Sequence, residues 1–359
     1  MRPTLATVQL DAIVHNYHVA ERLTPASQNI AVIKANAYGH GMVKVAQALE
    51  SSVPAFAVAF MDEAIQLREA GISRPILVMQ GASHASDIAE AAANDFWLMH
   101  HDQQQTDWVL SAKSSGPVTV WLKVDTGMHR LGLEPALLDQ ICAELLTSPN
   151  VRKEVVMCTH LACAADLDSP MTGQQVKTLR SCAGQYKLAL SIANSAGILC
   201  WPESHAEWNR PGYMLYGNDP TRSIDGDSFG LIPAMTMQSE VVAIRYLEPG
   251  DGVGYGLDWV AKRPSKIGTI AIGYGDGYPR HAPSGTPVLV NGQRVPLVGR
   301  VSMDSITVDL TELENAETGD PVELWGRGLS VNEVASAAGT IGYEILASLT
   351  GRAPLVYPS

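Results

Sequence analysis

Short apolar runs, rich in β-branched and aromatic residues, alternate with helical patterns between residue 30 and about residue 216. Eight runs are predicted to be strands: 30–34, 55–59, 75–79, 95–99, 117–124, 154–160, 188–194 and one within 206–216. Apolar residues spaced three and four apart predict helices in the segments between them: 40–50, 61–71, 86–94, 102–112 and 134–146. Strands that alternate with helices run parallel, and eight such units predict an α/β fold with an N-terminal (β/α)8, TIM-like barrel. A doubly wound open sheet is the structural alternative.

The pattern changes after about residue 231, where strands and turns replace the helices. Three segments alternate apolar and polar positions as strands do: 235–247, 266–274 and 286–310. Asn291 and Gly292 stand between two such runs, and this pair predicts a two-residue hairpin turn. Two short helical patterns follow, at 330–339 and 343–351. We therefore expect a barrel over residues 1–231 and a mostly β C-terminal domain over residues 232–359, packed firmly without a low-complexity linker.

The composition fits a folded enzyme, because 46% of the 359 residues are apolar and 17% are charged. The net charge is −12 and no basic run occurs. This argues against a nucleic-acid partner, since phosphate backbones are bound by clustered Lys and Arg. The first residues lack the apolar segment of a secretion signal, and no stretch is long enough to cross a bilayer. We expect no membrane association and a cytoplasmic location.

The five cysteines form an odd set without the spacing of a disulfide framework, which is typical of reduced thiols. Cys158, His160 and Cys163 lie close together in the sequence, as metal ligands do. However, they alternate along a strand-like run and do not follow a CxxC pattern. We expect no metal site.

Polar side chains lie at the ends of the last four predicted strands and of the first. The residues concerned are Lys34, Lys123, His160, Asn194, Ser195 and Arg210. In a parallel barrel the carboxyl ends of the strands converge on one mouth, where catalytic groups gather. A Lys or Arg buried there without a partner would be costly, so these positions are candidates for chemistry.

Lys34 ends an apolar strand and is followed by ANAYGHG, whose glycines allow a sharp turn into the next helix. Burial in such a site can lower the pKa of a lysine amine and make it a competent nucleophile and Schiff-base former. The structural alternative is a lysine at the barrel rim that extends its amine into solvent.

The segment AVIKANAYGHG at 31–41 resembles the cofactor-lysine signature of alanine racemases. Further similar segments follow in the same order: WLKVDTGMHRLG (121–132), THLACAAD (159–166), NSAGIL (194–199), NRPGYMLYG (209–217), VGYG (253–256), GYGDGYPR (273–280), GRVSMDSITVDL (299–310) and GYEIL (342–346). The resemblance covers essentially the whole chain. It implies an amino-acid racemase that uses pyridoxal 5'-phosphate, with alanine as its small-molecule substrate.

Racemisation needs removal of the α-proton on one face of the substrate and return of a proton on the other. The resemblance implies that Lys34 holds the cofactor and also serves as the base for the D-enantiomer. The second base would be Tyr255, contributed by the partner subunit of a homodimer with shared active sites. A tyrosine with a pKa of about 10 is a poor base near neutrality, so it needs cationic or donor neighbours. His160 and Arg210 match the residues that supply them in the family.

For the cofactor, the resemblance implies that Arg210 faces the pyridine nitrogen, where a permanent charge disfavours ring protonation. The phosphate would meet uncharged donors and backbone N–H groups. The matching residues are Tyr38, Ser195, the backbone of Gly212 and Tyr213, and Tyr343, with Asn194 beside them in the cofactor site. Taken singly, each of these is more often a packing or capping residue.

For the substrate, the resemblance implies that Arg130 binds the carboxylate. In many family members the equivalent of Lys123 carries a carbamate that positions this arginine, and only a neutral amine can be carbamylated. Met303 and Asp304 would come from the other subunit, with the Met303 backbone touching the carboxylate. Tyr274 and Arg280 are candidates for the entrance.

Two other classes of protein are open alternatives. A decarboxylase of the same architecture would need an acidic partner at the ring nitrogen, and Arg210 argues against it. A non-catalytic cofactor carrier would resemble the barrel alone. Residues 232–359, with Tyr255 and Met303, argue against that reading.

Overall fold

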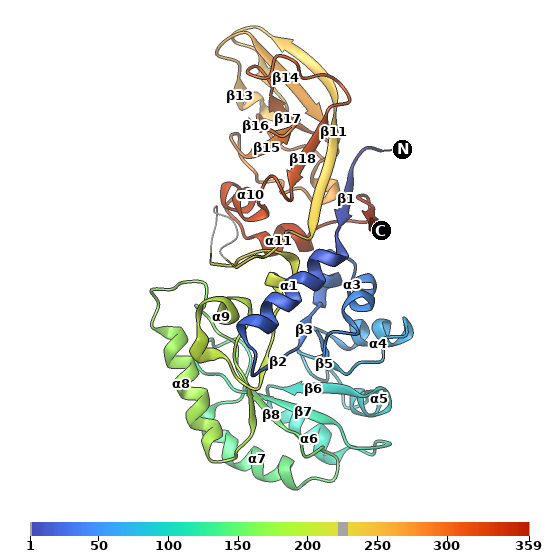
Figure 1. Cartoon of the computed structure of the whole chain (residues 1–359), viewed down its shortest axis with the longest axis vertical. Helices are drawn as coiled ribbons and strands as arrows, with labels where there is room; N and C mark the ends of the chain where they lie inside the picture. Colours follow the sequence, from blue (N-terminus) through green and yellow to red (C-terminus); the bar gives the residue numbers. More distant parts are fainter. Residues whose placement is uncertain (1, 222–228, 359) are drawn as a thin grey trace.

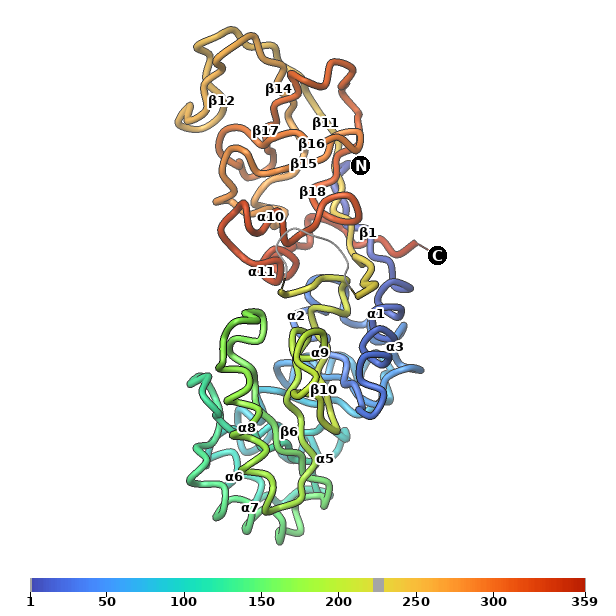
Figure 2. Tube along the Cα trace, turned by 60° about the vertical axis from the view of Figure 1, so that its left-hand side comes forward, coloured from blue at the N-terminus to red at the C-terminus, as the bar shows by residue number. Residues whose placement is uncertain are grey.

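The computed structural model describes residues 2–221 and 229–358. The chain forms two parts, a barrel from the first half of the sequence and a narrower, mostly β part that stands on it (Figure 1). The tube view from another side shows the same arrangement (Figure 2). The predicted order of an α/β barrel followed by a mostly β domain is confirmed.

The barrel is a parallel sheet whose segments are β2 (Gln28–Asn29), β3 (Ala31–Val32), β4 (Phe56–Val58), β5 (Ile76–Val78), β6 (Phe96–His100), β7 (Thr119–Lys123), β8 (Val156–Cys158), β9 (Ala189–Ser191) and β10 (Trp208–Asn209). β2 and β3 are halves of one strand, separated only by Ile30. The N–H of Ile30 donates to the carbonyl of Asn209 at 2.9 Å, and the N–H of Ala31 donates to that of Ala55 at 3.1 Å. The first strand therefore contacts both of its neighbours and the sheet closes, so the doubly wound alternative is wrong.

Helices surround the barrel sheet (Figure 1): α1 (Leu10–Leu23), α3 (Met42–Leu49), α4 (Met61–Glu69), α5 (Asp87–Asn94), α6 (Gln103–Ser111), α7 (Leu138–Thr147), α8 (Met171–Gly184) and α9 (Ser195–Cys200). α3 illustrates their construction, because Met42, Val45, Ala46 and Leu49 are buried and lie on one face of the helix. α3 to α7 confirm the five predicted helices. No helix of the described residues is both long enough and apolar enough to span a membrane.

Most barrel strands are shorter than the apolar runs that predicted them, and the last three differ most. The run 154–160 contains only the three residues of β8, and the run 188–194 only those of β9. In the segment 206–216, the two residues of β10 are followed by a 3-10 helix, Tyr213–Tyr216. Proline and glycine at 211–212 end the ladder there, because neither residue suits a strand interior. His160 and Asn194 consequently lie in loops beyond the strand ends.

The second part is built on β11 (Met235–Leu247), β14 (Ser265–Ile270), β15 (Pro287–Val290), β16 (Gln293–Pro296), β17 (Ile306–Asp309) and β18 (Pro321–Trp325). A small ribbon, β12 (Gly252–Val253) and β13 (Trp259–Val260), extends from it, and α10 (Val331–Ala338) and α11 (Gly342–Ala347) face the barrel (Figure 1). Asn291 and Gly292 join β15 to β16 with φ of 52° and 74°. Positive φ at both positions is the geometry of the predicted hairpin turn.

The first strand of the chain corrects the expectation that residues 1–231 all belong to the barrel. β1 (Leu5–Val8) pairs antiparallel with β11 and parallel with β19 (Leu355–Val356). Its alternation of half-buried and buried residues spans only four positions and runs into α1 almost at once. Such a short pattern cannot be separated from the helix that follows it. Both ends of the chain thus tie the barrel to the second sheet.

Candidate active site

The segment after Lys34 forms a left-handed turn, α2 (Lys34–Tyr38). Its residues Ala35, Asn36, Ala37 and Tyr38 have φ of 53°, 53°, 55° and 51°. Each L-residue in this conformation costs about 1–2 kcal/mol, so surrounding contacts must hold the turn. The predicted sharp turn is present, but non-glycine residues make it and the glycines follow it.

Three polar side chains hold the turn. Glu63 of α4 accepts a hydrogen bond from the N–H of Ala35 at 2.6 Å, while its other oxygen accepts from the N–H of Ala59 at 2.7 Å. The Asn36 side chain accepts from the N–H of Met42 at 2.9 Å. The third is His40, whose Nδ1 lies 2.9 Å and 3.1 Å from the carbonyl oxygens of Tyr38 and Ala37. No pattern in the sequence indicated these roles.

The predicted strand-end residues share one neighbourhood at the barrel mouth. Burial lowers the pKa of Lys34 most, and the charges of Arg130 and Arg210 lower it further, while the Glu63 carboxylate opposes them. Lys123 is buried, and this lowers its pKa together with the positive charges of Arg210, Arg130 and Lys34. Arg130 and Arg210 act on the pKa of both lysines, which means that the fold has brought these four side chains close together. A lysine amine in this surrounding shifts toward its neutral, nucleophilic form.

His160 lies in the same cluster of cations. Burial lowers its pKa well below the usual value, and the charge of Arg210 adds to the effect. The loop that carries His160 is fastened by Gln175 of α8. The Gln175 side chain donates to the carbonyl of His160 at 3.0 Å and accepts from the N–H of Ala162 at 2.8 Å. Burial therefore favours the neutral imidazole of His160, on a loop that Gln175 holds.

Arg210 is buried immediately after β10. Its guanidinium donates to the carbonyl of Ser191 at 2.9 Å and to that of Thr159 at 2.5 Å. It also donates to the Ser191 hydroxyl at 2.5 Å. These acceptors are uncharged, and no ion pair joins Arg210 to a carboxylate among the described residues. Its positive charge therefore remains available to whatever binds at the mouth.

Ser195 begins α9 and organises the backbone after β10. Its hydroxyl oxygen accepts from the N–H groups of Gly212 at 3.1 Å and Met214 at 3.2 Å, which leaves the hydroxyl proton free to donate. The N–H of Tyr213, between them, has no acceptor in the described part of the chain. Asn194 caps α9 by accepting from the N–H of Gly197 at 3.0 Å. These groups form a cradle of uncharged donors, the type of site that suits a phosphate.

Aromatic side chains close this cradle. The Tyr213 and Tyr343 rings stack with centroids 3.8 Å apart and planes 11° apart, and Tyr343 comes from α11 of the second part. A Cβ on Gly212 would lie 2.9 Å from the Tyr38 hydroxyl, so only glycine admits that hydroxyl without strain. The cofactor candidates Tyr38, Tyr213 and Tyr343 are thus gathered beside Ser195.

Arg130 is exposed on the loop that follows β7. Asp125 shapes this loop, because one of its carboxylate oxygens accepts from the N–H groups of Gly127 at 2.9 Å and Met128 at 3.0 Å, and also from His129 at 3.1 Å. Burial opposes ionisation of Asp125, yet these hydrogen bonds outweigh it and lower the pKa of the carboxyl. The sequence showed Arg130 but not the carboxylate that orders its loop.

Tyr255 does not reach the barrel mouth of its own chain. It lies in the 3-10 helix Tyr255–Leu257, between β12 and β13. These two strands belong to the end of the second part that points away from the barrel (Figures 1 and 2). Tyr255 is 67% exposed, and Met303 is 51% exposed. Asp304 is exposed beside Met303, while Tyr274 and Arg280 line a pocket with Glu344 of α11. One chain alone therefore assembles the cofactor candidates without Tyr255, while Met303 and Asp304 are exposed.

Cys158, His160 and Cys163, the cluster considered in the sequence analysis, do not form a group of metal ligands in the structure. Cys158 is buried within β8, with Arg210 and Lys123 close enough to act on its thiol. In the ranges that the structure describes, no group of three or more His, Cys, Asp or Glu side chains is placed to hold a metal ion.

The barrel with its cationic mouth and its C-terminal β part defines the class of (β/α)8-barrel enzymes that carry a second, β domain. Residues 8–220 match the family model of the alanine racemase N-terminal domain, and residues 234–357 match that of the alanine racemase C-terminal domain. The chain belongs to the alanine racemase family, and its activity is that of an amino-acid isomerase.

Individual relatives resemble the chain over its whole length. The biosynthetic alanine racemase of Pseudomonas aeruginosa is 47% identical over 99% of both chains, and its crystal structure superposes with a TM-score of 0.96 over 100% of both chains. An alanine racemase of Chromohalobacter salexigens is 46% identical over 99% of this chain and 98% of its own. The structure of the Bartonella henselae alanine racemase with covalently bound pyridoxal phosphate is 31% identical and superposes with a TM-score of 0.91 over 100% of both chains.

Proposed function

We propose that the chain interconverts L-alanine and D-alanine with pyridoxal 5'-phosphate bound covalently at Lys34. The observation that carries this proposal is the lowered pKa of a lysine that lies among cations at the barrel mouth, because a neutral amine is required to attack the cofactor aldehyde. The Bartonella henselae relative, whose structure contains covalently bound pyridoxal phosphate, supports the choice of cofactor. When bound, the cofactor delocalises the electron pair that remains after the α-proton leaves.

The residues present fit this cofactor. Tyr38, Ser195 and the N–H of Tyr213 supply uncharged donors for its phosphate, and Tyr343 closes the cradle by stacking on Tyr213. The N–H of Gly212 is engaged by Ser195, so Gly212 contributes its lack of a side chain. Asn194 acts through α9, whose first turn it caps.

Arg210 would meet the pyridine nitrogen, and its charge would keep that nitrogen unprotonated. A decarboxylase would need a carboxylate at this place, and the acceptors around Arg210 are uncharged carbonyls and a hydroxyl. Arg130 would bind the substrate carboxylate. The lowered pKa of Lys123 suits the neutral amine that carbamylation requires.

Two bases on opposite faces of the substrate would exchange its α-proton. Lys34 would serve D-alanine, and Tyr255 of the partner subunit would serve L-alanine beside His160 and Arg210. The position and exposure of Tyr255 support a shared site, because one chain does not bring it to Lys34.

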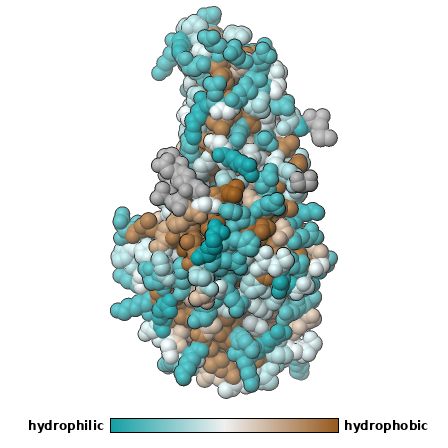
Figure 3. Space-filling view, in the orientation of Figure 1, coloured by the Kyte–Doolittle hydropathy of each residue, from teal (hydrophilic) through white to brown (hydrophobic). Residues whose placement is uncertain are grey.

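Exposed apolar side chains support a homodimer. Several large ones lie on the second part: Tyr255, Leu257, Val260, Tyr274, Met303 and Ile341. Figure 3 shows apolar side chains gathered on one face near the level where the two parts meet. Surfaces of this kind are typical of contacts between chains. We propose a homodimer in which each β part completes the partner's active site.

Exchange of the α-hydrogen in deuterated water tests the two-base assignment. Tyr255→Phe removes the proton acceptor for L-alanine and leaves Lys34 in place. Racemisation should fall by about 10² to 10⁴-fold, while the variant still washes the α-hydrogen out of D-alanine much faster than out of L-alanine. Equal wash-out from both enantiomers would favour a single mobile base and contradict the proposal.

A further inference from the structure

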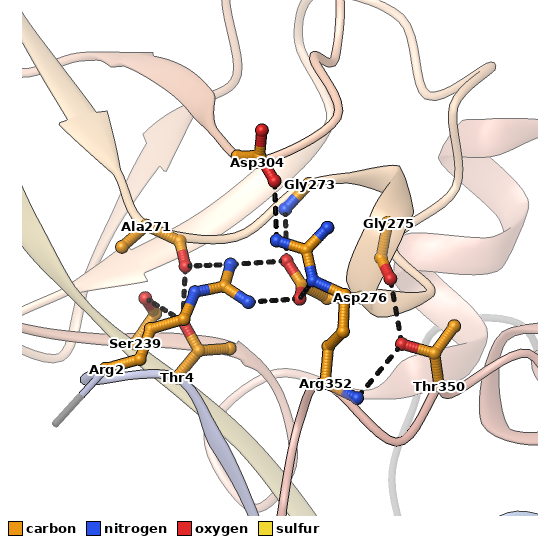
Figure 4. A network of polar contacts seen from close by, with 10 residues as sticks. All are labelled: Arg2, Thr4, Ser239, Ala271, Gly273, Gly275, Asp276, Asp304, Thr350 and Arg352. Atoms are coloured by element: carbon orange, nitrogen blue, oxygen red, sulfur yellow. Dashed lines mark hydrogen bonds and ion pairs between the residues drawn. The ribbon is translucent and has the colours of Figure 1, made fainter.

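A buried carboxylate in the second part holds two arginines. Asp276 ends the 3-10 helix Tyr274–Asp276 and its side chain has no exposed surface. Arg2 donates to both of its oxygens, with Nη2 2.6 Å from Oδ2, and the N–H of Gly273 donates to it at 3.0 Å. The Nε of Arg352 lies 3.4 Å from its other oxygen (Figure 4). Asp276 thereby fixes the N-terminal strand and the segment near the C-terminus to one loop.

Arg352 extends from this buried carboxylate to the exposed Asp304. Its Nη2 donates to Oδ1 of Asp304, whose side chain is 66% exposed (Figure 4). Thr350 adds further ties, because its hydroxyl donates to the carbonyl of Gly275 at 2.8 Å and its N–H donates to that of Asp276 at 3.2 Å. The Arg352 guanidinium therefore bridges the buried Asp276 carboxylate and the exposed Asp304 carboxylate.

The loop around Met303 is fixed at its backbone as well. The N–H of Tyr274 donates to the carbonyl of Ser302 at 3.0 Å, and that of Gly275 donates to the carbonyl of Met303 at 2.9 Å. The peptide between Ser302 and Met303 is planar and trans, so a fixed Ser302 carbonyl points the N–H of Met303 the opposite way. This N–H has no acceptor within residues 2–221 and 229–358.

Glycine is needed where the two loops meet. A Cβ on Gly273 would lie 2.2 Å from the Ser302 carbonyl oxygen, and one on Gly275 would lie 2.2 Å from a guanidinium nitrogen of Arg352. The close approach lets one loop dictate the conformation of the other.

We infer that Asp276 and Arg352 are positioning residues, which hold the Met303 N–H in the orientation in which it meets the substrate carboxylate in the partner subunit's active site. This inference rests on the proposed shared site. The charge arrangement supports it: burial opposes ionisation of Asp276, but hydrogen bonds from Arg2 and Gly273 outweigh burial and lower its pKa, so the anchor stays charged. The Asp304 carboxylate is in turn paired with Arg352, so it does not confront the substrate carboxylate as a free negative charge.

Hybrid dimers with one working site test the inference. One chain carries Lys34→Ala and the other keeps Lys34. Arg352→Gln in the Lys34→Ala chain should raise KM for both enantiomers about tenfold with kcat changed less than about twofold, because a misdirected hydrogen bond to a carboxylate is lost in ground and transition states alike. The same substitution in the chain that keeps Lys34 should leave KM unchanged. An equal effect in both placements, or none in either, would overturn the inference.

Matched variants separate this role from general stability. Arg294→Gln removes another arginine of the second part, whose guanidinium donates to the Glu333 carboxylate at 3.0 Å. Arg294 makes no contact with these loops among the hydrogen bonds of the described residues, so this variant should leave KM unchanged in both placements. Arg352→Lys keeps the positive charge, so its KM should lie between that of Arg352→Gln and that of the wild type. Tyr255→Phe in the same two placements tests the shared site itself. If Tyr255 acts in the partner and Arg352 does not, the inference alone fails; if Tyr255 acts only within its own chain, the shared site fails and the inference with it.

Discussion

The protonation of His40 should control the acid stability of the turn that carries Lys34. Its imidazole is buried, stacks on Tyr216 with ring centroids 4.4 Å apart, and presents Nδ1 to the carbonyl oxygens of Tyr38 and Ala37. Facing two acceptors, Nδ1 must carry the proton of a neutral ring. The other nitrogen, Nε2, has no hydrogen-bond partner among the described residues, so a second proton there would leave an unpaired buried charge.

The size of the effect follows from the pKa shift. Burial lowers the pKa of His40 from about 6.5 to about 4. Because the folded-state pKa is the lower one, the stability due to the neutral ring is fully present above pH 6.5 and is lost as the pH falls toward 4. Between pH 7 and pH 5 the loss amounts to about 2 kcal/mol, which corresponds to about 3 °C in the melting temperature of a chain of this length.

Calorimetric melting of the wild type and of His40→Asn at pH 7 and pH 5 checks this reasoning. The Asn amide retains an N–H donor near Nδ1 but does not titrate. The wild type should therefore lose about 3 °C more than the variant on acidification, at matched protein concentration. His100, whose pKa is also lowered by burial, contributes equally to both proteins. Tyr216 and the Tyr357 hydroxyl, which donates to the His40 carbonyl at 3.1 Å, are uncharged over this range. A difference that does not change with pH would refute the assignment.

Two further predictions concern the same face of the barrel. Gly39→Ala should destabilise the chain by at least about 2 kcal/mol more than Gly71→Ala in thermal melts, because both glycines have positive φ but only the new Cβ at position 39 meets a backbone oxygen, at 2.1 Å. An equal loss in the two variants would mean that the approach to α11 is adaptable. Asp125→Ala should raise KM for alanine about tenfold with little change in kcat, since it frees the loop that presents Arg130. Steady-state kinetics in both directions measure this, and a loss confined to kcat would contradict it.

The barrel could be predicted because its strands are buried on both faces and therefore appear as continuous apolar runs. The helix faces appeared as regular apolar spacing for a similar reason, as in α3. The same physics explains why Lys34, Lys123 and Arg210 stood out, since a charged residue at the end of an apolar run is conspicuous. Strand ends were less predictable, because a run such as 154–160 remains apolar after hydrogen bonding has stopped at Cys158.

The supports of the site could not be predicted from residue patterns. Glu63 is an ordinary acidic residue in the first turn of α4, and its bond to Ala35 joins residues 28 positions apart. The left-handed turn has no glycine within it, so no local signal marks it. The pairing of β1 with β11 depends on contacts across more than 200 residues. Each of these features arises from tertiary contact, which a single sequence does not display.

The excess of positive charge at the barrel mouth affects both the binding of anions and the reactivity of the Lys34 amine. The charges of Arg130 and Arg210 lower the proton affinity of Lys34 and of Lys123. Within the described residues, the one carboxylate whose charge acts on Lys34 is that of Glu63, whose oxygens accept hydrogen bonds from backbone N–H groups. This excess of positive charge attracts two anions, which in the proposed function are the cofactor phosphate and the substrate carboxylate. Burial and the same excess of positive charge lower the pKa of the Lys34 amine. Only the unprotonated amine can attack an aldehyde or accept a proton. A carboxylate introduced near Arg210 would therefore weaken anion binding and also raise the pKa of Lys34. In the proposed function, the absence of such a partner for Arg210 among the described residues would therefore serve both binding and catalysis.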